Sequence, residues 1–261
     1  MSSRLVLVAG DFHIPDRAID IPAKFKKLLT PGKIGQVLCL GNLTSPSVYT
    51  FLRSLAPDLQ LVKGDLDLPI HSITGSNPGA NNHSADPTLP PPAAAAAAAA
   101  SSYPIPTALS KVITHGSLRI GFTHGDTILP PGDPDALLIA ARQMDVDVLC
   151  WGGTCRFEAY EMEGKFFINP GSATGAPSWA DGEERLNADS GAGEDEEDGD
   201  PDRTIPSFVL MDVQGEVLVL YVYQLKRDAA GNENVGVEKV SFRKNNAAAG
   251  VATAAAGDAS R

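Results

Sequence analysis

Short apolar runs that alternate with helical segments dominate the first part of the chain. Residues 4–10, 36–41 and 59–64 have the pattern of buried strands, and residues 22–29 and 45–55 between them have helix-start signals such as an early proline. Parallel neighbours in a sheet need a crossover connection, which is usually a helix. The sequence therefore predicts a parallel sheet formed by these three strands.

The second part of the chain is richer in consecutive strands. Residues 111–114 and 118–123 predict a hairpin across His115, Gly116 and Ser117, and residues 133–143 predict a helix. Further strands are expected at 146–151, 156–162, 165–169, 207–213, 216–225 and 237–243. Hairpins beside a parallel sheet indicate two packed sheets flanked by helices. We therefore expect an α/β fold, a four-layer αββα sandwich, formed as a single domain by residues 1–244.

Three stretches have the composition of disordered chain. Residues 76–106 are rich in Asn, Pro and Ser and contain eight consecutive alanines, and residues 178–203 are rich in Gly and acidic side chains. Residues 245–261 form a tail of mostly Ala and Gly. We expect the first two to be disordered insertions in surface loops, because long loops cost little additional closure entropy.

The net charge of −11 belongs mainly to one of these stretches. Residues 181–202 contain eleven carboxylates and one arginine, so the rest of the chain is close to neutral. No basic surface is left to attract a phosphate backbone, and a nucleic-acid-binding function is disfavoured.

Cysteine content and the start of the chain indicate the compartment. Cys39, Cys150 and Cys155 are odd in number and show no paired spacing, which favours a reducing environment over a disulfide framework. No apolar run approaches the ~20 residues that a membrane-spanning helix needs, and the first residues do not have the pattern of a signal peptide. We expect a cytoplasmic protein.

Polar side chains follow five of the predicted strands at the point where each strand ends. They are Asp11 and His13, Asn42, Asp65, His124, and Cys155. Ligands of open α/β sheets bind at the carboxyl ends of the strands, and carboxylate and imidazole groups are common ligands of Mn, Zn or Fe. Each of these residues alone is also an ordinary turn or capping residue, but their joint placement predicts one cleft.

These motifs resemble the calcineurin-like metallophosphoesterase superfamily, whose motif order is D-x-H, G-D, G-N-H-[DE], H and G-H-x-H. Asp11, His13 and His124 match that order. The resemblance implies two bound metals, a metal-bridging hydroxide as nucleophile, and a histidine that assists phosphoester hydrolysis.

The chain departs from that pattern at five positions. Asn42 stands in place of the metal-bridging aspartate, Asp65 in place of asparagine, and Leu66 in place of the assisting histidine, while Gly153 and Cys155 replace both histidines of G-H-x-H. Cys155 retains the ability to bind zinc as a thiolate. The comparison with the superfamily implies no catalytic residues and no required cofactor, with weak Zn or Mn binding as the remaining possibility.

Longer segments resemble the family of small retromer subunits, which have a phosphoesterase fold and act in an endosomal sorting coat. The segments are residues 10–15, 22–29, 167–175, 205–212 and 221–225. This resemblance implies a non-catalytic scaffold for cargo retrieval from endosomes to the Golgi and plasma membrane. It also implies a cytoplasmic location, with attachment to the endosome membrane only through the complex.

Two binding surfaces are implied by the same resemblance. Ile128 and Leu129 match the contact with the C-terminal part of the large helical-solenoid subunit. A second patch matches the contact with Rab-regulating and other accessory proteins, which bind through short loops; it consists of Leu5, Leu28, Leu210, Tyr221, Tyr223, Val235 and Val237. From the residues alone, burial under a neighbouring helix is an open alternative for both sets.

Two other functions remain open at this point. One is an active metal-dependent phosphodiesterase or phosphatase. The other is a protein-binding module whose partner surface is shaped by a bound metal.

Overall fold

The computed structural model describes residues 4–67, 103–178, 205–227 and 231–244 of the 261-residue chain. The predicted insertions and tail lie outside the described residues, apart from residues 103–106 and 178. Within the described part, no helix is both long and apolar enough to cross a membrane.

The first sheet contains the predicted parallel strands at one end. Its order is β11 (Glu233–Arg243), β10 (Val217–Arg227), β9 (Ser207–Gln214), β1 (Arg4–Ala9), β2 (Gln36–Cys39) and β3 (Leu59–Leu61). β1, β2 and β3 pair in parallel, as predicted, and β9 pairs with the free side of β1 in the antiparallel direction. The last three strands therefore extend the sheet that the N-terminal segment begins.

Two helices cover the outer face of this sheet. They are α1 (Ala23–Leu28) and α2 (Pro46–Leu55), close to the predicted limits. The Ser45 side chain accepts a hydrogen bond from the Ser47 backbone, so it caps α2 ahead of Pro46, the early proline of the predicted helix. Phe25 of α1 packs edge-to-face on Phe208 of β9, with ring centroids 4.7 Å apart.

The second sheet is mixed. Its order is β4 (Ser110–His115), β5 (Leu118–Thr123), β6 (Val148–Cys150), β8 (Lys165–Pro170) and β7 (Phe157–Met162). β4 and β5 form the predicted hairpin, β7 and β8 form another, and β5, β6 and β8 are parallel. Helix α4 (Pro134–Gln143), capped by the Asp133 side chain, covers the outer face.

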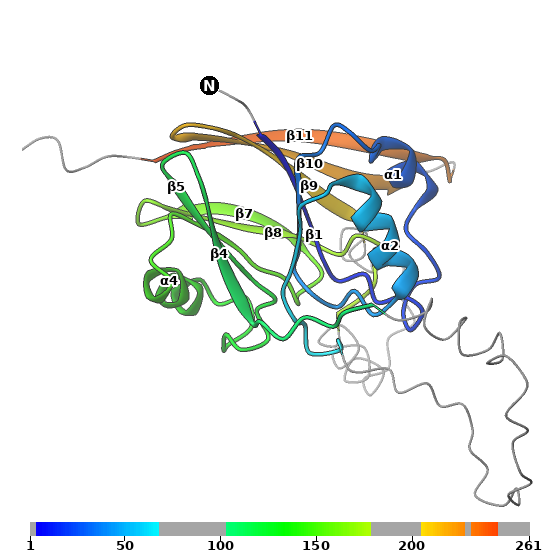
Figure 1. Cartoon of the computed structure of the whole chain (residues 1–261), viewed down its shortest axis with the longest axis horizontal. Coiled ribbons are helices and arrows are strands. Elements are labelled where there is room, and N and C mark those ends of the chain that lie inside the picture. Colours follow the sequence, from blue (N-terminus) through cyan, green and yellow to red (C-terminus); the bar gives the residue numbers. More distant parts are fainter. Residues whose placement is uncertain (1–3, 68–102, 179–204, 228–230, 245–261) are drawn as a thin grey trace, which may run out of the picture.

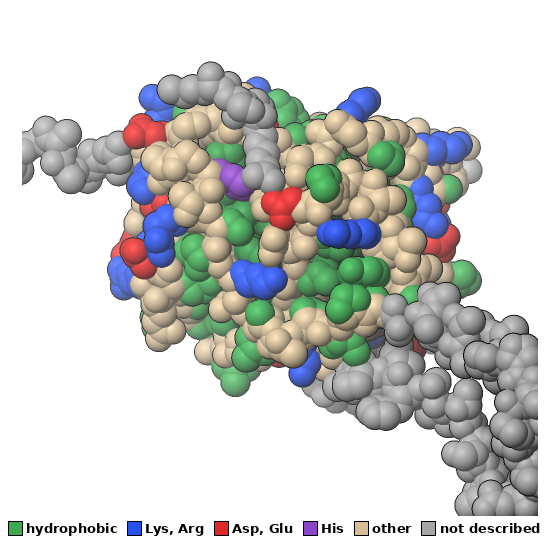
Figure 2. Space-filling model, viewed as in Figure 1, with side chains coloured by type: hydrophobic (Ala, Val, Ile, Leu, Met, Phe, Trp, Pro, Cys, Tyr) green, Lys and Arg blue, Asp and Glu red, His purple; other side chains and the backbone are tan. Residues whose placement is uncertain are grey.

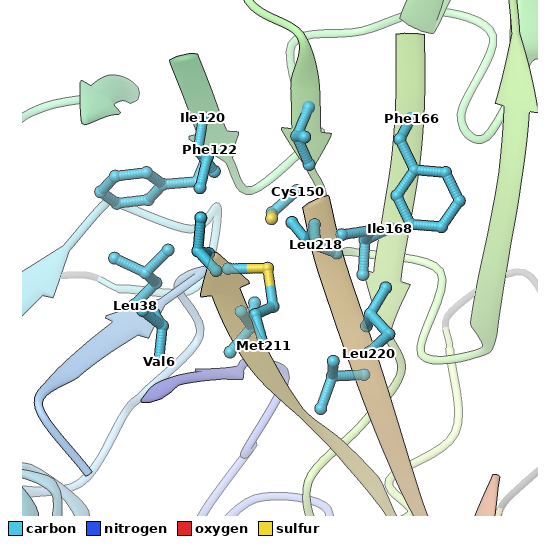
Figure 3. Close-up of a cluster of buried hydrophobic side chains, with 14 of the residues drawn as sticks. Val6, Leu38, Ile120, Phe122, Cys150, Phe166, Ile168, Met211, Leu218 and Leu220 are labelled. Atoms are coloured by element: carbon cyan, nitrogen blue, oxygen red, sulfur yellow. The ribbon is translucent and has the colours of Figure 1, made fainter. Parts of the chain in front are cut away.

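The two sheets pack face to face between these helices (Figure 1), which confirms the predicted four-layer sandwich. Alternation along each strand explains the three apolar layers: one set of side chains fills the space between the sheets, and the opposite sets pack under α1 and α2 or under α4. Figure 3 shows the central layer, in which the labelled side chains are Val6, Leu38, Ile120, Phe122, Cys150, Phe166, Ile168, Met211, Leu218 and Leu220.

Glycines at the ends of β2 and β3 allow the two strand ends to approach each other. Gly41 has a φ of +99°, and a Cβ atom there would lie 2.6 Å from the Gly64 nitrogen. A Cβ atom on Gly64 would collide with the Asn42 side chain. Any larger residue at either position would separate the loops that carry Asn42 and Asp65.

Truncation of Phe122 tests the central layer. Phe122 is fully buried between the sheets, so Phe122→Ala should lower the free energy of unfolding by about 3–5 kcal/mol through lost burial and a residual cavity. Chemical denaturation measures this difference. The control is Ile139→Ala on α4, where the side chain is 53% exposed and the expected change is within about 0.5 kcal/mol. Equal losses in the two variants would contradict the packing described here.

Candidate metal cleft

The predicted site residues converge at the carboxyl ends of β1, β2, β3, β5 and β6. Asp11, His13, Asn42, His124 and Cys155 are buried, whereas the Asp65 side chain is 46% exposed at the rim. Four of them have left-handed backbone conformations, with φ between 49° and 57°: Asp11, His13, Asn42 and Cys155. Such conformations are costly for non-glycine residues and cluster at functional sites. The structure thus brings all six predicted residues together.

Asp11, His13 and Cys155 form the first half of the cleft. The Nε2 atom of His13 lies 3.9 Å from Asp11 Oδ1 and 3.7 Å from Cys155 Sγ. One ligand atom from each of the three residues lies within 4.8 Å of the other two. Asp11 Oδ2 accepts a hydrogen bond from the Gly153 backbone at 2.8 Å, but Asp11 Oδ1 is buried without a hydrogen-bond partner among the described residues.

The electrostatics of this half favour a bound cation. Burial raises the pKa of Asp11 above its usual range, because a charged carboxylate loses its hydration there. Burial, with the Arg17 guanidinium nearby, lowers the pKa of His13 to about 4, so this imidazole is neutral at pH 7. A carboxylate, a neutral imidazole and a cysteine sulfur are all zinc ligands. These three residues therefore fit one divalent metal ion.

Asn42, Asp65 and His124 form the second half, and they bind one another. Asp65 Oδ1 accepts hydrogen bonds from Asn42 Nδ2 at 2.9 Å and from His124 Nε2 at 3.1 Å. The other ring nitrogen of His124 lies 2.9 Å from the backbone oxygen of Leu40. Each of the three side chains thus already has a partner at the positions where a second metal would bind.

The pKa values of His124 and Asp65 agree with those hydrogen bonds. Burial alone would lower the pKa of His124, but its hydrogen bond to Asp65 and the nearby charge of Asp11 raise that pKa to about 9. The hydrogen bond from His124 in turn holds the pKa of Asp65 well below its usual range. An imidazolium and a carboxylate therefore face each other in the half of the cleft away from Cys155.

A two-metal centre does not fit these residues. The side-chain oxygen of Asn42 accepts the Leu66 backbone N–H at 3.0 Å, so its NH₂ group faces Asp65 and His124, where a bridging carboxylate would have to present oxygen. Gly153 offers no side chain, and the apolar side chain of Leu66 cannot transfer a proton. The arrangement can hold one metal, but it lacks the ligands for the second.

Asp67 is a further residue of the cleft, and it was not predicted from the sequence. Its carboxylate is 1% exposed and accepts backbone hydrogen bonds from Asn42 at 2.8 Å and from Leu43 and Gly64 at 2.9 Å. Asp67 therefore ties the loop after β2 to the loop after β3. The signal in the sequence that could have identified Asp67 is its position two residues after Asp65, in the same short motif.

Two hydroxyl groups on a later segment hold the loop after β1. Ser172 Oγ donates to the backbone oxygen of Asp11 at 2.7 Å, and Thr174 Oγ1 donates to that of Phe12 at 2.8 Å. These contacts place the Asp11 and His13 side chains in the cleft. Both residues lie in the segment 167–175 that resembles the small retromer subunits, but neither was predicted to be a site residue.

The loop after β5 lies beside the cleft and carries the two predicted contact residues. Ile128 donates its backbone N–H to the Gly125 oxygen at 3.0 Å and packs against the apolar cluster under α4. Leu129, in contrast, is 72% exposed. Ile128 is thus partly buried against the cluster under α4, whereas the Leu129 side chain is exposed.

Six residues of the predicted accessory patch lie on strands of the first sheet, and the seventh, Leu28, is the last residue of α1. In the strand register, Tyr221 is opposite Leu210, and Tyr223 is opposite Val237. The Tyr223 ring stacks on Phe208 with centroids 4.7 Å apart. Helix α1 covers part of this face but leaves Leu28 47% and Val237 53% exposed.

Comparison with known proteins first establishes the class. Residues 5–186 match the calcineurin-like phosphoesterase superfamily domain, so the chain belongs to that superfamily. Vacuolar protein sorting-associated protein 29 of Schizosaccharomyces pombe is 45% identical over 240 residues, which span 92% of this chain and 98% of the relative. The chain therefore belongs to the Vps29 family, and the resemblance to the small retromer subunits is confirmed.

Solved structures agree with this assignment. Vps29 of Chaetomium thermophilum is 46% identical with a TM-score of 0.68, covering 92% of this chain and 99% of its own. The same protein has also been crystallised with a cyclic peptide. That structure is 45% identical to this chain with a TM-score of 0.66, covering 93% of this chain and 98% of its own. Vps29 of Entamoeba histolytica in complex with Zn²⁺ is 33% identical with a TM-score of 0.64, covering 92% of this chain and 99% of its own.

Removal of the Asp67 carboxylate tests its role in assembling the cleft. Asp67→Ala leaves buried backbone donors without an acceptor and should lower the free energy of unfolding by about 3 kcal/mol or more. Chemical denaturation of the full chain provides the measurement. The matched control is Asp126→Ala at an exposed site, which should leave stability almost unchanged. Similar stability of both variants would show that Asp67 does not hold the two loops.

Proposed function

We propose that this protein is a non-catalytic scaffold subunit of retromer. In this role it takes part in retrieval of cargo from endosomes to the Golgi and the plasma membrane. Family membership supports the retromer assignment. The non-catalytic part rests on one observation. The side chains of Asn42, Asp65 and His124 hydrogen-bond to one another, so they are already engaged where a second metal would need ligands.

Loss of the catalytic groups supports the same conclusion. A metal-dependent phosphoesterase uses two cations to stabilise the attacking and leaving oxygens. Here Asn42 cannot supply the bridging charge, and Leu66 cannot act as a general acid, which alone contributes roughly 10²–10⁴ in rate. The cleft therefore supports binding far better than hydrolysis.

The large helical-solenoid subunit is the proposed partner of the cleft face. Leu129 is a bulky aliphatic side chain that projects into solvent, and Pro130 and Pro131 after it limit the freedom of the loop. A preorganised loop loses little entropy on binding. Ile128 below it anchors the loop to the cluster under α4.

The outer face of the first sheet is the proposed site for Rab-regulating and other accessory proteins. Hydrophobic side chains are also visible in patches on the molecular face drawn in Figure 2, with Lys and Arg side chains between and around them. On the accessory patch itself, Leu28 and Val237 are exposed, and the half-buried Tyr223 pairs with Val237 in the strand register. Short apolar loops fit such a surface. The protein would reach the endosome membrane only through these partners.

A charge placed on the loop after β5 tests the first surface. Leu129→Asp should weaken binding of the full chain to the large subunit by about 2 kcal/mol or more, since truncation of a buried apolar anchor has that cost. Isothermal titration calorimetry measures the affinity. Ile19→Asp, at a side chain that is 94% exposed, is the matched control and should bind like the parent. Unchanged affinity in Leu129→Asp would remove this residue from the interface.

Charges on the outer sheet face test the second surface separately. Leu210→Glu and Val237→Glu should both lose accessory-protein binding and keep the affinity for the large subunit. Val237 is the safer of the two positions for folding, because its side chain is 53% exposed whereas that of Leu210 packs against the apolar cluster under α1 and α2. Retained accessory binding in both variants would contradict the assignment of this face.

Hydrolysis of an aryl phosphodiester distinguishes the scaffold from an enzyme. We expect no turnover above the background of free metal when the full chain is supplied with Zn²⁺ or Mn²⁺. The outcome that contradicts the proposal is metal-dependent hydrolysis that Asp11→Ala and His124→Ala both abolish.

A further inference from the structure

We propose that the free edge of β11 pairs two copies of this chain, strand to strand, in an antiparallel register centred on Gly236. β11 is the last strand in the order of the first sheet, with β10 as its neighbour. It forms the upper margin of the molecule in Figure 1. The edge of a sheet is a template for pairing with another strand. This inference goes beyond the scaffold role, which does not depend on it.

The hydrogen bonds between β10 and β11 identify the backbone groups at this edge. The Lys244 backbone N–H donates to the Glu216 oxygen at 3.0 Å, next to the pair of Arg243 with Val217. Hydrogen-bonded pairs alternate along an antiparallel ladder, so the even-numbered residues of β11 bind β10. The odd-numbered residues then direct their N–H and C=O groups outward. These residues are Val235, Val237, Lys239, Ser241 and Arg243.

The other contacts of β11 agree with an open edge. The oxygen of Glu233, an odd-numbered residue at the start of the strand, accepts a hydrogen bond from Lys24 Nζ of α1. From Val235 onward, no hydrogen bond within the described part of the chain reaches the outward backbone groups. β11 contains no proline, and its register with β10 runs without a bulge. The common devices that prevent edge pairing are therefore missing from this strand.

The side chains of β11 favour one register. Outward backbone groups meet only when odd-numbered residues face odd-numbered residues. With Gly236 at the two-fold axis, Glu233 faces Lys239 of the second copy, and Val235 faces Val237. Opposite charges and apolar pairs across two strands stabilise a sheet, whereas registers centred on Glu238 or Lys239 would place like charges directly opposite each other.

Lys239 supplies an independent observation for this register. A lysine on an edge strand normally discourages pairing. Lys239 is exposed, and no carboxylate of the described residues lies within ion-pair distance of it. Glu233 lies 3.2 Å from Arg227, but its side chain remains 37% exposed, so a second cation can reach it. The second copy would thus supply the partner that Lys239 lacks in its own chain.

The paired sheet would bring two accessory patches together. Val235 packs with the apolar cluster under α1 and α2, and Val237, two residues later, lies on the same face of the strand. Both residues belong to the accessory patch, so the patches of the two copies would adjoin across the axis. Leu129 follows β5 of the second sheet and takes no part in this edge. Each copy would therefore keep its surface for the large subunit.

Sedimentation velocity of the full chain over a range of concentrations tests the pairing. We expect a reversible equilibrium between monomer and dimer. Val237→Pro removes an outward N–H near the axis and should leave a monomer over the same range, whereas Val237→Thr keeps the N–H and should still dimerise. Lys239→Glu places like charges opposite each other twice and should raise the dimer dissociation constant about tenfold. Adding Glu233→Lys to Lys239→Glu should restore the dimer.

Gly236→Cys tests the register directly. Residues at the axis would face each other with Cα atoms about 4.5 Å apart, within reach of a disulfide. A Cβ atom at Gly236 has room, since its nearest neighbour, the Gln224 oxygen, would be 3.9 Å away. Mild oxidation should link two copies of Gly236→Cys but not of Glu238→Cys, because each Glu238 faces Asn234 of the other copy. The native cysteines are buried and should not interfere.

Three results would overturn the proposal. One is a parent chain that stays monomeric, as it would if another segment or a partner protein occupied the edge. The others are a dimer that survives both Val237→Pro and Lys239→Glu, and equal cross-linking of Gly236→Cys and Glu238→Cys. Affinity of each variant for the large subunit serves as the folding control and should match that of the parent.

Discussion

The buried side chain of Asn42 is the constraint on which the cleft depends. Its amide nitrogen and His124 Nε2 converge on one oxygen of Asp65, while its own oxygen accepts the Leu66 N–H. An aspartate at this position would carry a negative charge and attract two cations. The amide has no net charge and instead links three neighbouring residues. In this half of the cleft, hydrogen bonds therefore have the stabilising role that a bound metal has in a hydrolase of this fold.

The sandwich explains why such a cleft remains well formed without full metal occupancy. Asp67 joins the loops after β2 and β3, and Ser172 holds the loop after β1 from the other side of the cleft. These contacts use backbone groups, so they do not require catalytic side chains. The same frame supports the exposed Leu129 loop beside the cleft and, on the far face of the first sheet, the patch around Tyr223. A rigid frame with two separate apolar surfaces suits a subunit that connects partners.

Much of the fold and of the cleft could be predicted from the sequence, because local signals specify local structure. The limits of α2, its cap at Ser45 and the parallel order of the first three strands follow from short-range patterns. The return of β9 to the side of β1 could not be predicted, since pairing between segments about 200 residues apart leaves no local signal. Convergence of the cleft residues followed from strand ends, but the orientation of the Asn42 amide and the role of Asp67 depend on the three-dimensional packing of the loops.

Anomalous X-ray diffraction is the most direct test of a cleft that has kept one metal position and lost the other. Crystals of the full chain equilibrated with both zinc and manganese would be measured at the absorption edge of each metal. We expect one zinc peak within bonding distance of Asp11, His13 and Cys155, with the Asn42 amide still hydrogen-bonded to Asp65. A second peak beside Asn42, bridged to the first, would contradict it.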